Sequence, residues 1–444
     1  MSTAAVMTGA IAQTSAPEGA AAARLAALAP RPTTLAATGL GAELLGELAS
    51  KLLLRAGVLS LGALAERLGI AGNILLDIIA LLRREARIEV RPGGELELAY
   101  VLSERGRQLA LDALLRDGYV GPAPVRLEEY ARIVAAQTVH GRHVTRATMQ
   151  RAFSGLVLSD DLRDRLGAAL NSGRAMFLHG APGTGKTYVA HRLGRAFSGE
   201  ILVPHALLVN DSIVRLMDPA VHEDLELLGA ASPLLLNAGF DPRYVCCERP
   251  VVHAGGELDL PMLEVTRRGA TRELLAPLQM KANNGLLLID DLGRQRAAPE
   301  QILNRWIVPM EERTDHFSID GNTHFTVPFD VVLVFSTNLK PQSLADDALL
   351  RRLGYKIEFK PIPADAYRRI WEHTCRSVQL PFERELVDFA IAQLYGKHGA
   401  ELLPCHPRDL LNMVVDRLRY EQSDAVVDRE LLTWAWDNYF LQSR

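Results

Sequence analysis

The sequence predicts an α/β protein, in which helices cover a parallel β-sheet. A smaller α+β domain precedes this core and a helical segment follows it. Three patterns support the prediction. Four candidate strands alternate with helical patterns between residues 156 and 362, and three of them are nearly continuous apolar runs, as expected for strands buried on both faces of a parallel sheet. Nearer the N-terminus, two alternating segments follow several helical patterns. After residue 363 only helical periodicity remains.

The composition is typical of a globular protein. Of the 444 residues, 48% are hydrophobic and 23% are charged, and the formal net charge of -4 requires neither nucleic acid nor a membrane as partner. The four cysteines lack the spacing of zinc ligands or redox pairs, so we expect them to be reduced and buried. No apolar run approaches the roughly 20 residues of a membrane-spanning helix, and no membrane partner is expected.

Residues 1–38 are rich in Ala, Thr and Pro, and we expect them to form a disordered tail. A signal peptide begins with basic residues and continues with an unbroken apolar stretch. Here no Lys or Arg precedes Arg24, and polar residues interrupt the apolar run. We therefore expect a cytoplasmic protein.

Residues 39–118 show the element order of a winged-helix domain: helices, a turn, a further helix, two strands around a Gly-rich tip and a last helix. The candidate recognition helix, 73–85, offers Asn73 and Asp77 amid apolar residues, with its arginines at the far end. Acidic residues slightly outnumber basic ones over the domain, whereas binding to DNA phosphates favours a positive excess. We therefore expect this domain to dock on protein, with docking on duplex DNA as the alternative.

The remaining boundaries follow from turn signals and changes of period. Residues 119–155 open with Gly-Pro-Ala-Pro and are expected to form a linker with helices. The α/β core is expected over 156–362 and the helical segment over 363–444. Within the core, 201–268 is long for the interval it fills. An alternating stretch with a Gly-Gly turn suggests an inserted hairpin there, without an assigned role.

The strongest chemical signal is the run Gly-Ala-Pro-Gly-Thr-Gly-Lys-Thr at 180–187, which fits G-x-x-x-x-G-K-[ST] between a predicted strand and a predicted helix. Its glycines let backbone N–H groups surround phosphates, and the helix adds its positive N-terminal end. The ammonium group of Lys186 is expected on the β- and γ-phosphates, and the Thr187 hydroxyl on Mg²⁺. The candidate nucleotide-binding residues here are Gly180, Ala181, Pro182, Gly183, Thr184, Gly185, Lys186, Thr187 and Tyr188.

Two carboxylates follow the apolar run 286–289, where the tip of a buried strand should face the phosphate loop. We expect Asp290 to hold Mg²⁺ through water, and Asp291 to orient or deprotonate the water that attacks the nucleotide. The alternative is that both are helix-capping residues. Asn338 follows a second apolar run, 331–337, and is expected to reach the attacking water or the γ-phosphate. Taken alone, this ending is more typical of a turn.

Three arginines complete the candidate site. Arg351 and Arg352 end a predicted helix before the strand at 355–359, where one of them could reach the γ-phosphate of a neighbouring subunit. A local salt bridge is the alternative. Arg408 follows Pro407 at a helix start and is expected to point toward the phosphates of its own subunit.

These elements, in this order, resemble the AAA+ ATPase superfamily over about 156–444. By resemblance, residues 180–187 are Walker A, Asp290 and Asp291 are Walker B, Asn338 is sensor 1, Arg351 and Arg352 form the arginine-finger region, and Arg408 is sensor 2. The resemblance implies a P-loop αβα core, a helical lid, ATP hydrolysis with Mg²⁺ and a homo-oligomer, usually a hexameric ring.

Softer similarities point to subfamilies. The helix at 309–313 and a hairpin at Asp320-Gly321 are similar to the segment before sensor 1 in MoxR-type ATPases, where such hairpins can face the ring pore. The sequence Ile-Asp-Asp-Leu-Gly is similar to helicase loaders and transposition helpers. Most superfamily members have Glu where this chain has Asp291, so slow turnover is one expectation.

Together, these features suggest an ATP-driven motor that remodels or regulates a protein client recruited by the winged helix. A DNA-associated regulator or loader and a non-hydrolysing ATP switch are the alternatives.

Overall fold

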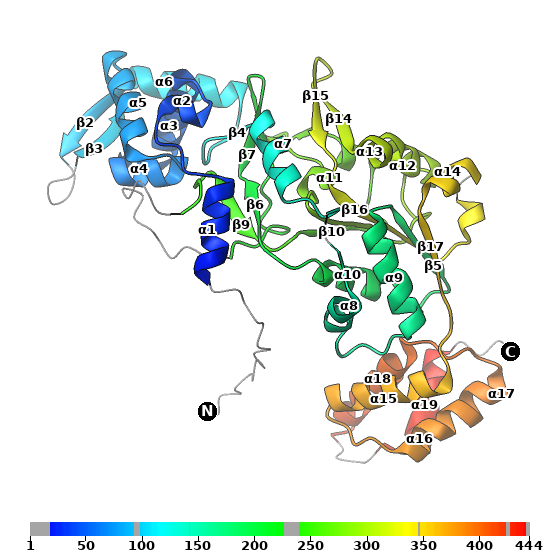
Figure 1. Ribbon diagram of the computed structural model, residues 1–444. Coiled ribbons are helices and arrows are strands. Elements are labelled where there is room, and N and C mark those ends of the chain that lie inside the picture. The colour runs from blue at the N-terminus through cyan, green and yellow to red at the C-terminus, as the bar shows by residue number, and fades with distance from the viewer. Residues whose placement is uncertain are drawn as a thin grey trace. The chain divides into compact units, whose positions relative to one another are not determined.

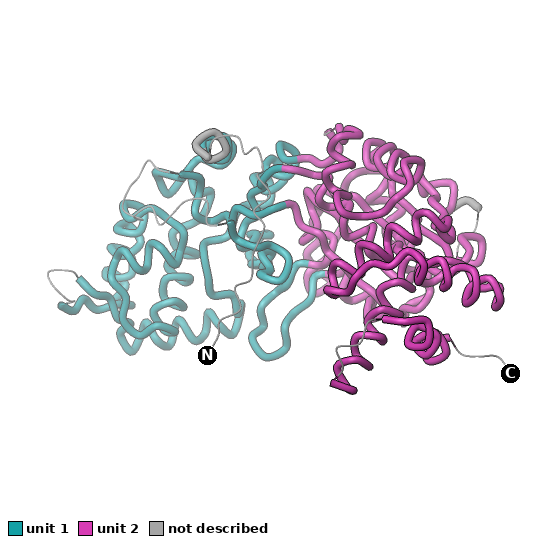
Figure 2. The backbone as a smooth tube through the Cα atoms, turned by 90° about the horizontal axis from the view of Figure 1, so that it is seen from below, with its two compact units in different colours: residues 1–137, 199–248, 265–276 teal, residues 138–198, 249–264, 277–444 magenta. Residues whose placement is uncertain are grey.

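The computed structural model describes residues 18–92, 98–141, 143–225, 239–344, 347–422 and 427–440. They belong to two compact units, each assembled from separated stretches of chain (Figure 2). Unit 1 comprises residues 1–137, 199–248 and 265–276, and unit 2 comprises 138–198, 249–264 and 277–444. The chain therefore passes between the units five times. The expectation that 156–362 forms one core is wrong, because two parts of that range belong to unit 1.

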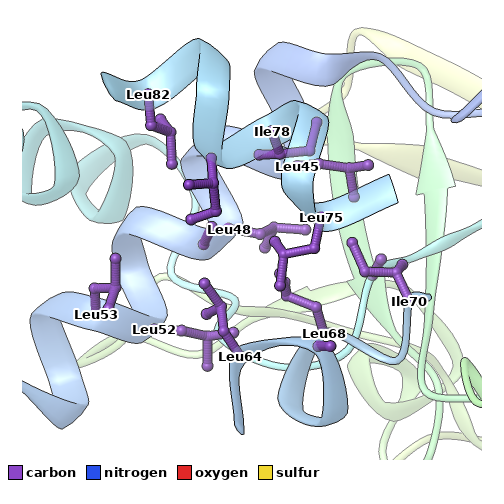
Figure 3. Packing of buried hydrophobic residues seen from close by; sticks show 14 of the residues in the cluster. Leu45, Leu48, Leu52, Leu53, Leu64, Leu68, Ile70, Leu75, Ile78 and Leu82 are labelled. Atoms are coloured by element: carbon purple, nitrogen blue, oxygen red, sulfur yellow. The ribbon is translucent and has the colours of Figure 1, made fainter. Parts of the chain in front are cut away.

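The first part of unit 1 is a helical cluster with a three-stranded antiparallel sheet of order β1-β3-β2 (Figure 1). Leucine and isoleucine side chains from three helices point toward one another in its core (Figure 3). Leu45, Leu64 and Leu75 are fully buried, and each such side chain stabilises the fold by about 1.5–3 kcal/mol. The elements are α3 (Ala42–Ala56), β1 (Val58–Ser60), α4 (Leu61–Leu68), α5 (Gly72–Arg84), β2 (Ile88–Pro92), β3 (Leu98–Leu102) and α6 (Glu104–Arg116).

The order of these elements follows from local signals in the sequence. The hydroxyl of Ser60 caps α4 by accepting from the Ala63 N–H, and Ser103 caps α6 through the Gly106 N–H. A side chain at Gly106 would collide with the backbone just before β2, since its Cβ would lie 1.8 Å from the carbonyl oxygen of Arg87. The tip between β2 and β3, including the expected Gly-rich turn, lies outside the described residues.

Part of the N-terminal segment is ordered, contrary to expectation. It forms α1 (Glu18–Leu28) and α2 (Leu35–Thr38), the latter capped by the Thr34 hydroxyl. Leu25 is 1% exposed and packs in a cluster with Val125 and Tyr244. The expected disorder is therefore wrong for residues 18–38, while 1–17 lie outside the described residues.

The second part of unit 1 contains a five-stranded sheet of order β11-β12-β8-β7-β4 and a two-stranded sheet, β6-β9. A buried ion pair joins it to the N-terminal segments: the Arg243 guanidinium bonds both carboxylate oxygens of Asp241 and the carbonyl oxygens of Thr38 and Pro124. The elements are β4 (Val125–Arg126), α7 (Leu127–Ala136), β6 (Ile201–Pro204), β7 (Ala206–Val209), β8 (Ser212–Arg215), β9 (Tyr244–Cys247), β11 (Thr266–Arg267) and β12 (Leu274–Leu275).

Unit 2 is built on a five-stranded sheet of order β10-β13-β16-β5-β17, in which every neighbouring pair is parallel. This confirms the predicted α/β class. The four predicted strands are present. The fifth strand, β10, lies in the segment where an inserted hairpin was expected; that expectation is wrong for β10, because it pairs in parallel with β13. The strands are β5 (Met176–Gly180), β10 (Val251–Ala254), β13 (Gly285–Ile289), β16 (Val331–Thr337) and β17 (Tyr355–Phe359).

Helices cover both faces of this sheet, which explains its continuous apolar strands. Alternate strand residues such as Leu178, Leu288 and Val334 pack in one cluster with the helices after and before β5. On the other face Phe335 contacts Trp306, with ring centroids 5.8 Å apart. The helices are α8 (Arg146–Ala152), α9 (Asp160–Ser172), α10 (Lys186–Leu193), α11 (Leu278–Lys281), α12 (Pro299–Arg305), α13 (Ile307–Glu312) and α14 (Asp347–Arg352), with 3-10 turns at Gly194–Ala196, Leu260–Leu263 and Pro341–Ser343.

A hairpin and a helical subdomain complete unit 2. Strands β14 (Thr314–Ile319) and β15 (Thr323–Pro328) pair around Asp320 and Gly321, as expected, with positive φ at both turn residues. The helical subdomain has an aromatic core in which Tyr395 contacts Trp436, with centroids 4.6 Å apart. Its helices are α15 (Ala364–Ser377), α16 (Arg384–Phe389), a π-helical segment (Ala390–Tyr395), α17 (Gly396–His398), α18 (His406–Tyr420) and α19 (Arg429–Tyr439). Among the described residues, none of the helices has the length and apolar character needed to cross a bilayer.

Candidate nucleotide site

The phosphate loop connects β5 to α10, as its sequence pattern predicts. Gly183 and Gly185 adopt φ values of 80° and 90°, which side-chain-bearing residues rarely tolerate. Gly180 has φ 144°, and a Cβ there would lie 2.2 Å from the carbonyl oxygen of Phe359 on the neighbouring strand. The three glycines are therefore required by the backbone path of the loop.

Lys186 is the first residue of α10 and is only 5% exposed. Its ammonium group donates to the carbonyl oxygens of Gly180 (2.9 Å) and Ala181 (2.8 Å) and to the side-chain oxygen of Asn338 (2.8 Å). Burial lowers the pKa of Lys186, while the nearby charges of Asp290 and Asp291 oppose that shift. The cation thus lies where the loop, the tip of β16 and the acidic pair meet.

Thr187 and Asp290 lie side by side. The Thr187 hydroxyl donates to the Oδ2 atom of Asp290 at 2.7 Å. The backbone of Asp290 is held on both sides: its N–H donates to the Ala254 carbonyl (2.8 Å), and its carbonyl accepts from the Gln295 side-chain amide (2.8 Å). A hydroxyl beside a carboxylate oxygen suits Mg²⁺, which takes few protein oxygen ligands together with phosphate oxygens and water. No cluster of three or more His, Cys, Asp or Glu able to hold a metal occurs among the described residues.

Asp291 and Asn338 form the third contact of the site. The Asn338 side chain donates from Nδ2 to Oδ1 of Asp291 at 2.9 Å while its own oxygen accepts from Lys186. The Asp291 backbone has φ 49°, a left-handed conformation that is uncommon outside glycine. Asn338 therefore bridges the lysine of the phosphate loop and the second acid after β13.

The two arginines at the end of α14 differ in their surroundings. The Arg352 guanidinium pairs with the Glu311 carboxylate at 2.7 Å. Arg351 is exposed, and no ion pair joins it to the side chains that the structure describes. The side chains of Asp346 and Asp347, the local partners weighed from the sequence, lie outside that description, so their pairing with either arginine stays untested.

Arg408 and Tyr188, both expected to contact the nucleotide, have exposed side chains. Arg408 opens α18 as predicted, but its side chain is 68% exposed and pairs with Asp409 at 3.3 Å. No hydrogen bond joins Arg408 to the loop in the part of the chain that the structure describes. Tyr188 is 51% exposed, and its hydroxyl accepts from Arg192 at 2.9 Å.

The helical subdomain nevertheless reaches the phosphate loop through residues that the sequence did not single out. A Cβ placed on Gly183 would lie 2.6 Å from the Cys405 sulfur and 3.4 Å from the Leu403 side chain. Cys405 is half-buried, unlike the three fully buried cysteines, and all four are free thiols. Burial raises the pKa of the Cys405 thiol, so it acts here as a packing residue.

Sequence reasoning also missed His253 and Gln295. His253 lies on β10, the strand that the sequence suggested as part of a hairpin, and Nε2 of its ring is 3.6 Å from Oδ2 of Asp290. Gln295 follows the acidic pair, and its amide donates to the carbonyls of Asp290 and Gly255. The apolar spacing of 251–254 was the only signal that could have placed His253 at the sheet edge.

Comparisons with known proteins give partial matches. A family model described as "Domain of unknown function (DUF8689)" matches residues 363–438. The structure is similar to NtrX from Brucella abortus, at 13% identity and a TM-score of 0.41, over 64% of this chain and 57% of that chain. NtrX in complex with ATP matches at 12% identity and a TM-score of 0.40, over 76% and 64% of the two chains. The RuvB Holliday junction branch migration motor from Thermotoga maritima matches at 14% identity and a TM-score of 0.36, over 66% and 73%. This chain thus spans less than two thirds of the NtrX chain, and no curated protein matches it.

Proposed function

We propose that this chain is an AAA+-type ATPase, which binds ATP with Mg²⁺, hydrolyses it at subunit interfaces and uses the energy to remodel or regulate a protein client. One observation carries the proposal: the side chains of Lys186, Asn338 and Asp291 form a continuous hydrogen-bonded series beside the phosphate loop. This series connects a cation suited to phosphates with a carboxylate suited to activating water.

Each residue of the series has a role in this proposal. Lys186 binds the β- and γ-phosphates, exchanging the carbonyl oxygens of its own loop for phosphate oxygens. Asp291 orients the attacking water and takes its proton, and Asn338 keeps that carboxylate in place. Thr187 and Asp290 would hold Mg²⁺, which when bound neutralises charge on the phosphate oxygens.

The proposed arrangement is a homo-oligomer, with a hexameric ring as the form implied by resemblance. Arg351 is exposed and without an ion pair among the described side chains, which makes it the better candidate to contact the γ-phosphate of a neighbouring subunit. Arg352, held by Glu311, would anchor the helix that presents it. The exposed Arg408 would reach the phosphates of its own subunit only after the helical subdomain moves.

We further propose that unit 1, with its winged-helix pattern, recruits the client. On α5 the Asn73 amide already donates to the Thr33 carbonyl at 2.8 Å, which leaves this helix poorly suited to reading base edges. That contact supports a protein client over the alternative of docking on duplex DNA.

The test has two steps. First, the full chain should hydrolyse ATP in the presence of Mg²⁺, and Lys186→Ala should not. Second, Asp291→Asn, which retains ATP, should capture a client that Lys186→Ala does not capture. Binding of ATP without turnover under any condition would indicate a nucleotide switch instead of a motor.

A further inference from the structure

His253 lies at the edge of the candidate metal site, outside the residues that the proposed function uses. It belongs to β10, which pairs with β13 so that His253 is opposite Leu288. Its Nε2 atom is 3.6 Å from Oδ2 of Asp290, the same oxygen that accepts from the Thr187 hydroxyl. The carboxylate of Asp290 is thus flanked by a hydroxyl oxygen and an imidazole nitrogen.

The ring nitrogen is not committed to another partner. A separation of 3.6 Å is too long for a hydrogen bond, and the His253 ring makes no hydrogen bond to any other described side chain. The side chain is 39% exposed, so the ring has room to turn. The Thr187 hydroxyl oxygen and the His253 Nε2 atom both lie near Oδ2 of Asp290, so the three atoms are suited to binding one cation or one ordered water.

A second histidine supports the position of the first. His191 lies on α10, four residues after Thr187, and its ring meets that of His253 edge-on with centroids 4.7 Å apart. The His191 ring therefore packs against one side of the His253 ring. One imidazole, backed by a second, therefore lies with a hydroxyl and a carboxylate where an oxygen-only site would suffice for Mg²⁺.

We propose that His253 supplies a nitrogen ligand to the divalent cation bound with the nucleotide, so that this site accepts Mn²⁺, Co²⁺ and Ni²⁺ more readily, relative to Mg²⁺, than a site of oxygen ligands would. The inference rests on the proposed nucleotide site and adds to it the identity of the metal. Magnesium prefers oxygen, whereas imidazole suits transition metals, with affinity rising from Mn²⁺ through Co²⁺ to Ni²⁺.

The probe is Mn²⁺ with ADP bound to the full-length protein, followed by pulsed electron paramagnetic resonance. Wild-type protein should show coupling of the manganese electron spin to ¹⁴N. In protein labelled with ¹⁵N-histidine, the ¹⁴N coupling should be replaced by ¹⁵N coupling. This replacement would exclude the adenine of ADP as the source of the signal. His253→Gln should abolish the signal, and His324→Gln, on the exposed part of the β14–β15 hairpin, should retain it.

Metal competition gives a second readout, independent of turnover. The ratio of Mn²⁺ to Mg²⁺ affinity for the protein–ADP complex should fall about tenfold in His253→Gln and remain unchanged in His324→Gln. In His253→Gln, the affinity ratios of Co²⁺ and Ni²⁺ to Mg²⁺ should fall further than the ratio of Mn²⁺ to Mg²⁺.

The outcomes separate this inference from the proposed function. Tight binding of Mn²⁺ and ADP without nitrogen coupling, or with coupling that ¹⁵N-histidine leaves unchanged, would overturn the metal assignment and leave the nucleotide site intact. Failure of wild-type protein to bind Mn²⁺ and ADP would overturn both. The isotope experiment uses unmodified protein, so it tests for a histidine ligand even if His253→Gln folds poorly, and His191→Gln, which should retain the signal, separates His253 from its neighbour.

Discussion

The Oδ1 atom of Asp291 accepts a 2.9 Å hydrogen bond from the Nδ2 atom of Asn338, although 47 positions separate the two residues in the sequence. The contact joins the ends of two adjacent parallel strands, β13 and β16. An amide N–H can only donate, so Oδ1 of Asp291 is the acceptor in this bond. The Oδ2 atom of Asp291 is left for a different partner.

Replacement of Lys186 by Ala should abolish ATP binding. The substitution removes the only ammonium group among the described residues that bonds the phosphate loop, and a charge-assisted bond to phosphate is among the strongest contacts in such a site. Calorimetry with a slowly hydrolysed ATP analogue measures the effect. Lys340→Ala, which changes an exposed lysine after β16, is the matched control. Unchanged affinity in Lys186→Ala would contradict the assignment of the loop.

Replacement of Asp291 by Asn should preserve nucleotide binding and lower turnover by about 10²-fold or more, because the amide cannot accept a proton from water. The variant keeps an oxygen that can accept from Asn338, so the local structure should survive. Steady-state phosphate release, measured beside equilibrium binding, separates the two effects. Equal turnover in the variant and the wild type would show that Asp291 does not activate water and serves only as a capping residue.

Arg351→Ala should lower turnover by about 10³-fold, the effect expected for an arginine that acts on a neighbour's γ-phosphate. Arg352→Ala should change it by only a few-fold, because exposed ion pairs such as that with Glu311 contribute little. Mixing Arg351→Ala with Lys186→Ala subunits should restore part of the activity, since some intact loops would then face intact arginines. A monomer in sedimentation with ATP present, with activity independent of protein concentration, would exclude this mechanism.

Unit 1 should lose stability as the pH falls from about 6.5 to 4. Burial lowers the pKa of His205 from 6.5 to about 4, with Asp224 opposing the shift and Arg215 adding to it. Since the folded pKa is the lower one, the unfolded state takes up the proton first, and the folded state loses up to about 3 kcal/mol across that window. Above pH 6.5 both states are neutral and the effect vanishes. In denaturant titrations His205→Gln should show a shallower pH dependence; identical slopes would refute the assignment.

The full chain should bind duplex DNA no more tightly than a Kd of about 10⁻⁶ M at physiological salt, a value typical of nonspecific contacts. The reason is the near-neutral balance of charge in residues 39–118 and the engagement of Asn73 with Thr33. A shift assay with random and selected duplexes measures it. Tight, sequence-selective binding would favour the DNA-associated function.

The parts of the fold that the sequence predicted well are those in which local patterns carry the information. The loop at 180–187 is recognisable because only glycine accepts the positive φ of Gly183 and Gly185. Three strands of the parallel sheet, β5, β13 and β16, are apolar runs because both of their faces are covered. The sharp turn at Asp320 and Gly321 likewise needs residues that tolerate positive φ.

The parts that were missed depend on contacts between distant segments. Strand β10 is four residues long and contains His253, so nothing local distinguishes it from a hairpin arm. Helix α1 is rich in alanine, and its Leu25 is buried only because Val125 and Tyr244 come from far along the chain. The approach of Arg408 to the phosphates stays a prediction, because helix start and order carry no information on side-chain direction.

The way the chain is shared between the two units limits how the protein can be dissected. Deleting residues 1–137 would leave 199–248 and 265–276 behind, and would strip Arg243 of the carbonyl oxygens of Thr38 and Pro124 that bond its guanidinium. A protease cut at any of the three inner passages, after residue 198, 248 or 264, yields two fragments that each carry pieces of both units, so they should comigrate until denatured. Truncation, the usual way to assign a role to an N-terminal domain, would therefore report misfolding; point substitutions on the surface of unit 1 are the means to map what it recruits.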